Sequence, residues 1–166
     1  MPPITALLHT TNDALRLGRA LETVLPCSEI LVVDHGSNDT TRQIAREYGA
    51  RIVHATSLAP LNHCAVNHYL DLARNDWIFC MEARESQTDG LQASLFEWAA
   101  LPHESTLGTS AFSVFIRHEV DGVWSDPIGP EIRLVPRSWT WWRGRLPAQQ
   151  PPAVPLEGEL LRFAYP

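Results

Sequence analysis

The sequence predicts an α/β fold, with a mostly parallel sheet flanked by helices and a smaller, mixed β C-terminal half. Short apolar runs alternate with amphipathic segments over residues 1–100, an order typical of parallel strands joined by helices. Residues 101–166 instead carry aromatic and β-branched runs separated by turn residues. Because the chain has 166 residues, we expect one domain, 1–166, built from these two halves.

The strands of the first half are short apolar runs, as expected for strands that are buried on both faces. They cover residues 4–9, 30–33, 51–54 and 76–81. Each is followed by a segment with apolar residues at helical spacing. This strand–helix order predicts right-handed crossovers between parallel strands.

Capping residues place the helices between these strands. Thr11 or Asn12 can cap a first helix, which we expect to end near Pro26. Thr40 and Gln43 are spaced like a capping box at the start of the second helix, and Gly49 suits the position after its end. Two more helices are predicted at residues 62–73 and 89–100.

The second half reads as a set of β-strands. Residues 111–120 predict a strand, and Asp121-Gly122 predicts a hairpin turn after it. Residues 131–135 predict another strand, the proline-rich residues 147–155 an irregular loop, and residues 159–165 a last edge strand.

Composition narrows the classes of protein and partner. The net charge of −6 argues against a general nucleic-acid binder, which is usually basic. No apolar run approaches the roughly 20 residues that span a bilayer, and the N-terminus lacks the basic region of a signal peptide. We therefore expect no nucleic-acid partner, no transmembrane segment and a cytoplasmic location. The three cysteines form no Cys-x-x-Cys pair and read as buried free thiols.

Residues 32–41 read Val-Val-Asp-His-Gly-Ser-Asn-Asp-Thr-Thr. This stretch resembles the VVDxGSxDxT signature of family 2 glycosyltransferases, which have a GT-A fold. Residues 10–13 resemble the family's threonine-x-asparagine-glutamate segment, and residues 131–137 resemble a segment of its lipopolysaccharide-type members. The resemblance implies a GT-A-like, Rossmann-type sheet, with a nucleotide-binding half at residues 1–100 and a reduced acceptor-side half at residues 101–166. It also implies a nucleotide-sugar donor of the UDP-sugar type and transfer to an acceptor hydroxyl with inversion.

The resemblance carries over four nucleotide-sugar-binding residues from these motifs. Asp34 would contact the nucleoside, Thr10 would lie near the base, and Asp39 near the nucleotide. Asn67 lies where many members have arginine-asparagine at the start of a helix, and Val66 takes the arginine's place. The alternative for both aspartates is that they only satisfy the turn and cap the helix after it.

The family's Asp-x-Asp metal motif is altered in this chain, which reads Met-Glu-Ala-Arg-Glu at residues 81–85. In the family these acids hold a divalent cation, Mg²⁺ or Mn²⁺, against the diphosphate. Glu82 and Glu85 are the candidate ligands, and Glu82 would lie at the diphosphate or ribose. Arg84 cannot bind a cation. Either Arg84 faces the diphosphate in the metal's place, or it pairs with one of the glutamates in an inert network.

The acid that usually serves as the catalytic base is also missing. Inverting members carry it after a Trp-x-Gly segment, where this chain has Pro147 and Ala148. The candidates that remain are Glu131 and Asp126, with Glu157 and Glu159 beyond the proline-rich loop. Two hypotheses follow: an active inverting transferase, or an inactive relative that binds a nucleotide-sugar or a protein. A nucleotidyltransferase is disfavoured because no glycine-rich loop follows the first strand.

Overall fold

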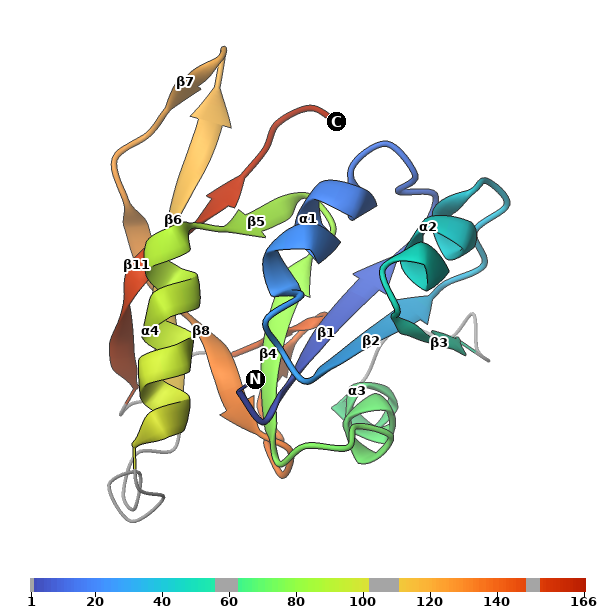
Figure 1. Cartoon of the computed structure of the whole chain (residues 1–166), viewed down its shortest axis with the longest axis horizontal. Helices are drawn as coiled ribbons and strands as arrows, with labels where there is room; N and C mark the ends of the chain where they lie inside the picture. Colours follow the sequence, from blue (N-terminus) through green and yellow to red (C-terminus); the bar gives the residue numbers. More distant parts are fainter. Residues whose placement is uncertain (1, 56–62, 102–110, 149–152) are drawn as a thin grey trace.

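The computed structural model describes residues 2–55, 63–101, 111–148 and 153–166. The first half contains β1 (Ile4–Thr10), α1 (Leu17–Val24), β2 (Glu29–Asp34), α2 (Thr41–Glu47), β3 (Arg51–His54), α3 (His63–Asp71), β4 (Trp77–Glu82), β5 (Glu85–Gln87) and α4 (Asp89–Ala100) (Figure 1). The second half contains β6 (Phe112–Val120), β7 (Val123–Trp124), β8 (Ile128–Pro136), β9 (Trp142–Arg143), β10 (Leu146–Pro147) and β11 (Val154–Arg162).

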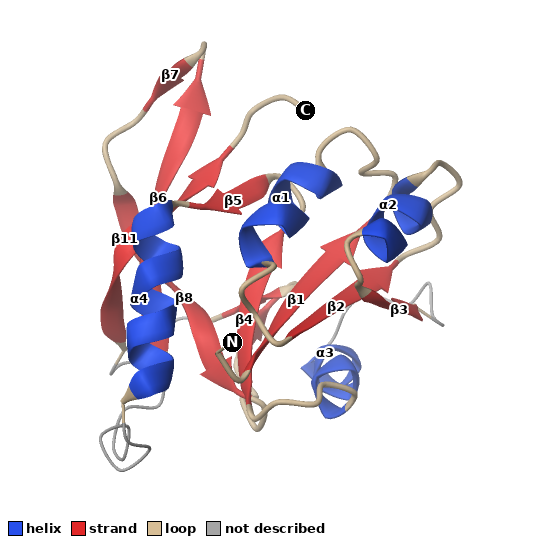
Figure 2. Ribbon diagram, viewed as in Figure 1, coloured by secondary structure: helices blue, strands red, loops and turns tan. Residues whose placement is uncertain are grey.

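One large sheet unites the two halves, with the strand order β3-β2-β1-β4-β8-β6-β11-β5 and β7 paired to β6. The first four strands in this order are parallel, and β8 then joins β4 in the antiparallel sense (Figure 2). β9 and β10 form a separate two-stranded hairpin. The structure thus has the predicted α/β architecture, with a parallel first half and a mixed second half.

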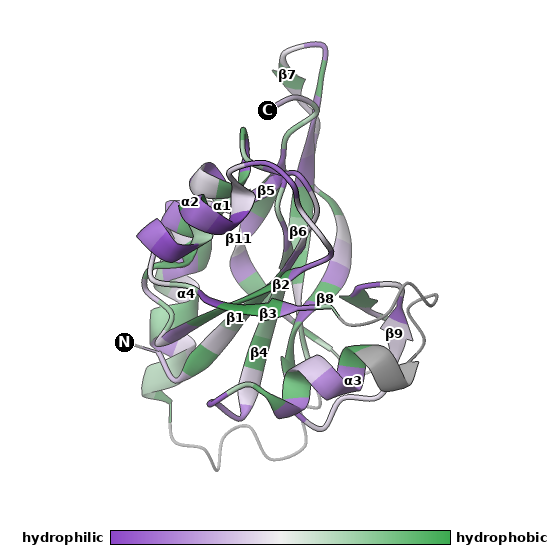
Figure 3. Ribbon diagram, turned by 90° about the vertical axis from the view of Figure 1, so that its right-hand side faces the viewer, coloured by the Kyte–Doolittle hydropathy of each residue, from purple (hydrophilic) through white to green (hydrophobic). Residues whose placement is uncertain are grey.

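Helices cover both faces of the parallel strands. α1, α2 and α4 pack on one face, and α3 packs on the other together with the tryptophan-rich segment before β10 (Figure 3). Alternate residues of β1 serve the two cores: Ala6 and Leu8 face the first group of helices, whereas Leu7 faces α3. Trp139 and Trp142 are buried in this second core.

Three predicted details differ from the structure. α1 begins at Leu17, because Asn12 adopts a left-handed φ of 53° and the next two backbone N–H groups, of Asp13 and Ala14, donate to the side chains of Thr41 and Asp39. Thr40 makes no side-chain cap to α2; the Asp39 carboxylate accepts from Thr41 N instead. β11 is not an edge strand, because it lies between β6 and the three-residue β5.

The remaining expectations concern membrane segments and cysteines. Within the described ranges, no helix is both long and apolar enough to cross a bilayer. Cys27 and Cys80 are buried free thiols, and burial raises the pKa of each to about 12. The side chain of Cys64 lies outside the described residues, as does residue 62 at the start of the predicted third helix.

Candidate functional site

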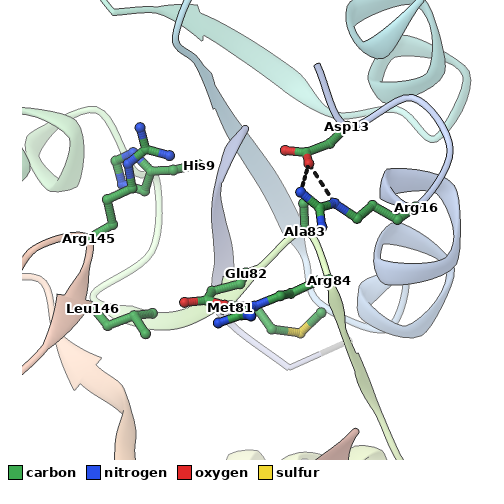
Figure 4. A pocket seen from close by; sticks show the side chains of 9 residues that line it. All are labelled: His9, Asp13, Arg16, Met81, Glu82, Ala83, Arg84, Arg145 and Leu146. Atoms are coloured by element: carbon green, nitrogen blue, oxygen red, sulfur yellow. Dashed lines mark hydrogen bonds and ion pairs between the residues drawn. The ribbon is translucent and has the colours of Figure 1, made fainter. Parts of the chain in front are cut away.

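Two adjoining cavities lie at the carboxyl ends of the parallel strands. β1 has β2 on one side and β4 on the other, so the chain order reverses at the β1–β4 boundary, where open α/β sheets bind ligands. The first cavity, of about 170 Å³, opens there between His9 of β1 and Glu82 of β4 (Figure 4). The second, of about 280 Å³, is lined by Glu131 and Arg162 and shares Glu82 and Leu146 with the first. We name them after the predicted halves of the chain that supply most of their lining: the donor-side cavity after the nucleotide-binding half, and the acceptor-side cavity after the acceptor-side half.

The polar residues of the signature turn bond mainly to the loop after β1. Ser37 Oγ accepts from Asn12 N at 3.0 Å, and Asn38 N donates to Asn12 Oδ1 at 2.9 Å. Asp39 accepts from Ala14 N at 3.3 Å as well as from Thr41 N. These contacts between two loops hold the rim of the site, and they occupy the carboxylate of Asp39.

Asp34 ends β2 at the base of the same turn. Its side chain is 1% exposed, and its two oxygens accept from Ser37 N at 3.2 and 3.3 Å. His54 Nδ1 and Arg42 Nε lie 3.7 and 3.9 Å from Oδ2. Asp34 does not line either cavity. Its carboxylate holds the turn, and its predicted contact with a nucleoside stays a prediction.

Thr10 and Asn67 are likewise engaged within the chain. The buried Thr10 hydroxyl donates to Asp13 Oδ2 at 2.8 Å. Asn67 Oδ1 accepts from Trp142 Nε1 at 2.8 Å, which links α3 to the β9–β10 hairpin. Neither residue lines the two cavities, so their predicted roles in binding a nucleotide-sugar also stay predictions.

Glu82 and Arg84 both line the donor-side cavity. Arg84 Nε donates to Glu82 Oε2 at 2.6 Å, and the two side chains are 46% and 32% exposed. This is the pairing that one sequence hypothesis predicted. The bond uses only Nε, and neither terminal nitrogen of Arg84 has a hydrogen-bond partner among the described residues.

Glu85 points away from the cavity into a buried ion-pair network. Its carboxylate accepts from both terminal nitrogens of Arg133 at 2.8 and 2.9 Å and from Nε and Nη2 of Arg162 at 2.9 and 2.7 Å. Glu85 and Arg133 are both 0% exposed. Burial alone would raise the pKa of Glu85, but Arg133, the backbone N–H of Glu82 and Arg162 outweigh it and lower the pKa.

This geometry does not fit a divalent cation at the altered motif. Glu85 has both oxygens committed to arginines, Glu82 is bonded to Arg84, and Arg84 itself offers no lone pair. Over residues 2–55, 63–101, 111–148 and 153–166, no three His, Cys, Asp or Glu side chains group as a metal site. The described residues of the altered motif therefore do not supply a ligand set for Mg²⁺ or Mn²⁺.

Of the four candidate bases named from the sequence, Glu131 alone lines either cavity. Glu131 lines the acceptor-side cavity, where its Oε2 accepts from Arg133 Nη2 at 2.9 Å and lies 3.4 Å from Arg162 Nη2. Asp126 is exposed in the connection between β7 and β8 and lines neither cavity. The geometry thus selects Glu131 as the stronger candidate.

Several residues at the site did not stand out in the sequence. The β9–β10 hairpin carries two of them: Arg145 lines the donor-side cavity, and Arg143 lines the acceptor-side cavity. His9 lines the donor-side cavity, and its Nδ1 lies 2.9 Å from His35 Nε2. Burial, followed by His35 and Arg145, lowers the pKa of His9 to about 3, so this imidazole is neutral. The two arginines flanking Gly144 were the available signal.

Comparison with known families identifies the chain. The family model described as Glycosyl transferase family 2 matches residues 5–99, more than half of the 166 residues. The chain belongs to glycosyl transferase family 2. An uncharacterized glycosyltransferase of Rickettsia felis is 33% identical over 93 residues, which are 55% of this chain and 32% of that protein. The family 2 domain thus spans about a third of the length of the curated relatives it matches.

Solved structures show the same GT-A fold. Residues 1–349 of S. aureus TarS, in complex with UDP-GlcNAc, match with a TM-score of 0.53 and 17% identity over 74% of this chain and 36% of that chain. The mannosyltransferase PcManGT from Pyrobaculum calidifontis, with GDP-Man and Mn²⁺, matches with a TM-score of 0.52 and 22% identity over 68% of this chain and 35% of that chain. The predicted GT-A-like fold is therefore confirmed.

Proposed function

We propose that this family 2 domain binds a nucleotide-sugar of the UDP-sugar type in the donor-side cavity and transfers the sugar to an acceptor hydroxyl with inversion. The observation that carries the proposal is the position of this cavity between the carboxyl ends of β1 and β4. The nucleoside would extend toward the signature turn held by Asp34, and the diphosphate toward Glu82 and Arg84. The acceptor would enter the adjoining cavity beside Glu131.

In this mechanism Glu131 is the base. Its carboxylate takes the proton of the acceptor hydroxyl, while the hydroxyl oxygen forms a bond to the anomeric carbon from the face opposite the diphosphate. The bond from that carbon to the diphosphate oxygen breaks, and its electron pair leaves with the nucleoside diphosphate. A single displacement of this kind inverts the configuration at the anomeric carbon.

A second function is favoured by a specific observation about Glu131. Its carboxylate already accepts a hydrogen bond from Arg133 and faces Arg162, and the altered motif does not fit a metal ion. A domain with these features can bind a nucleotide-sugar, or a protein partner, without turnover. A nucleotide-sugar would occupy the donor-side cavity in both functions, and only the first function includes transfer of the sugar.

Two experiments test both functions. The first is calorimetric titration with UDP, UDP-GlcNAc and GDP-mannose. The second measures release of the nucleotide and transfer of the sugar to added acceptors. We expect UDP and its sugar to bind, since the donor-side cavity adjoins the signature turn. If the domain is active, Glu131→Gln should lower transfer by about 10²–10⁴-fold with an unchanged Kd for the donor, whereas Asp126→Asn should have no effect. Binding without release or transfer would support the inactive function, and no binding of any nucleotide would refute both transfer and nucleotide-sugar binding.

A further inference from the structure

We infer that the donor-side cavity holds a diphosphate group directly through Arg145 and Arg84, with no divalent cation between protein and ligand. The inference deepens the proposed function, on which it rests for the identity of the natural ligand. It concerns the ligand's most highly charged part and the residues that neutralise it.

Arg145 is the residue of this site whose charge is available to a ligand. It lines the cavity from the turn between β9 and β10 and lies beside His9, whereas Arg84 lines it from the turn between β4 and β5 and lies beside Glu82 (Figure 4). Across the described ranges Arg145 forms no ion pair, so its charge is available to a ligand. A guanidinium offers several N–H donors in a planar fork, and this geometry suits phosphate oxygens.

The hairpin that carries Arg145 is fixed to the body of the domain. Trp142 is buried in the second core and donates to Asn67 of α3, and Ala148 N donates to Trp141 O at 2.9 Å across the hairpin. Arg145 therefore belongs to a hairpin that is already held in place, which lowers the entropy cost of ordering this segment when an anion binds.

The other charges around the cavity leave an excess of positive charge. Arg16 is bonded to Asp13 through Nε and lies 2.6 Å from it through Nη2, and Arg84 is bonded to Glu82. These two pairs balance, and Arg145 adds one cation that has no ion-pair partner in the part of the chain that the structure describes. His9 forms part of the wall as a neutral imidazole whose Nε2 has no partner among the described residues.

The altered motif explains why arginines would take this role. A diphosphate needs its charge neutralised, and acids can supply this only by recruiting a cation. Here Glu85 is sequestered by Arg133 and Arg162, so the acids cannot assemble a cation site. Arg145 can supply the net positive charge, and the terminal nitrogens of Arg84, at the place of the motif's second acid, can supply N–H donors.

The test is calorimetric titration of the whole chain with inorganic pyrophosphate, UDP and uridine, in EDTA and in Mn²⁺. We expect pyrophosphate and UDP to bind equally well in both buffers, and more weakly as salt is raised. Arg145→Gln should weaken both by about tenfold or more, since it removes a charge-assisted contact, and should leave uridine unaffected. Arg143→Gln, on the same hairpin but facing the acceptor-side cavity, is the matched control and should change neither Kd.

Each outcome bears on one proposal or the other. UDP binding that requires Mn²⁺, or an Arg145→Gln variant with unchanged affinity, overturns the metal-free site and leaves the proposed function standing. Pyrophosphate binding that depends on Arg145, without any binding of nucleotides, supports the anion site and overturns the nucleotide-sugar function. No binding of either ligand overturns both. Circular dichroism of each variant confirms that a lost affinity does not reflect lost folding.

Discussion

Replacing Glu85 by Gln should destabilise the domain strongly. The size of the loss tells whether Glu85 stabilises the fold or serves as a metal ligand. Glu85 is fully buried and accepts five hydrogen bonds, four from Arg133 and Arg162 and one from Glu82 N. Gln keeps the shape but loses the charge, and its amide nitrogen would face guanidinium donors. Removing one partner of a buried ion pair costs about 3–5 kcal/mol, a large share of a typical domain's 5–15 kcal/mol.

The assay is urea unfolding followed by tryptophan fluorescence, with Glu82→Gln as the matched control. Glu82 belongs to an exposed pair with Arg84, so its loss should cost at most about 1 kcal/mol. A loss below about 1 kcal/mol for Glu85→Gln, with an unchanged m-value, would refute the buried network. An unchanged stability together with a lost response to Mn²⁺ would instead show that Glu85 is a metal ligand.

The pH dependence of the same variant provides an independent check. Because the folded-state pKa of Glu85 is lowered, its stabilising contribution is complete above the unfolded-state pKa of about 4.3 and is lost as pH falls through the folded-state pKa. The stability difference between the parent chain and Glu85→Gln should therefore be constant near neutral pH and should shrink below about pH 4. A difference that stays constant through acid pH would contradict the assignment of the charge.

Two further predictions concern how the site is held in place. A Cβ on Gly158 (φ 85°) would lie 2.1 Å from Leu91 N, whereas a Cβ on Gly122 (φ 76°) would meet no atom within 4 Å. In urea unfolding, Gly158→Ala should therefore lower the free energy of unfolding by about 2–5 kcal/mol, and Gly122→Ala by about 1–2 kcal/mol. Equal losses in the two variants would contradict the close contact at Gly158. A double-mutant cycle of Asn67→Ala and Trp142→Phe should give a coupling of about 0.5–1.5 kcal/mol in urea unfolding, and a coupling near zero would contradict the hydrogen bond between these two side chains.

The parallel half of the fold could be predicted because its signals are local. The apolar run of β2 ends at Asp34, and Gly36 adopts the positive φ of 87° that a tight turn requires. The helix end at Gly49, with a φ of 74°, follows from the same property of glycine. Such features depend on residues that are neighbours in the chain, so a single sequence reveals them.

The direction of each acid at the site could not be predicted, because it depends on distant residues. Glu85 is turned inward by Arg133 and Arg162, which follow it by 48 and 77 positions. The three-residue β5 that carries Glu85 is too short and polar to show a strand period. Likewise, Arg145 reaches the donor-side cavity only because the β9–β10 hairpin packs against α3 through Trp142.

The two sequence hypotheses for Arg84 turn out to be compatible. One placed it at the diphosphate and the other in a pair with a glutamate. The structure contains the pair with Glu82, yet the bond uses Nε and leaves the terminal nitrogens of Arg84 without a partner among the described residues. Because an exposed pair of this kind contributes little stability, its main effect is to restrict where the guanidinium points. A side chain already restricted in this way loses less entropy when an anion binds, so the pairing with Glu82 favours a binding role for Arg84.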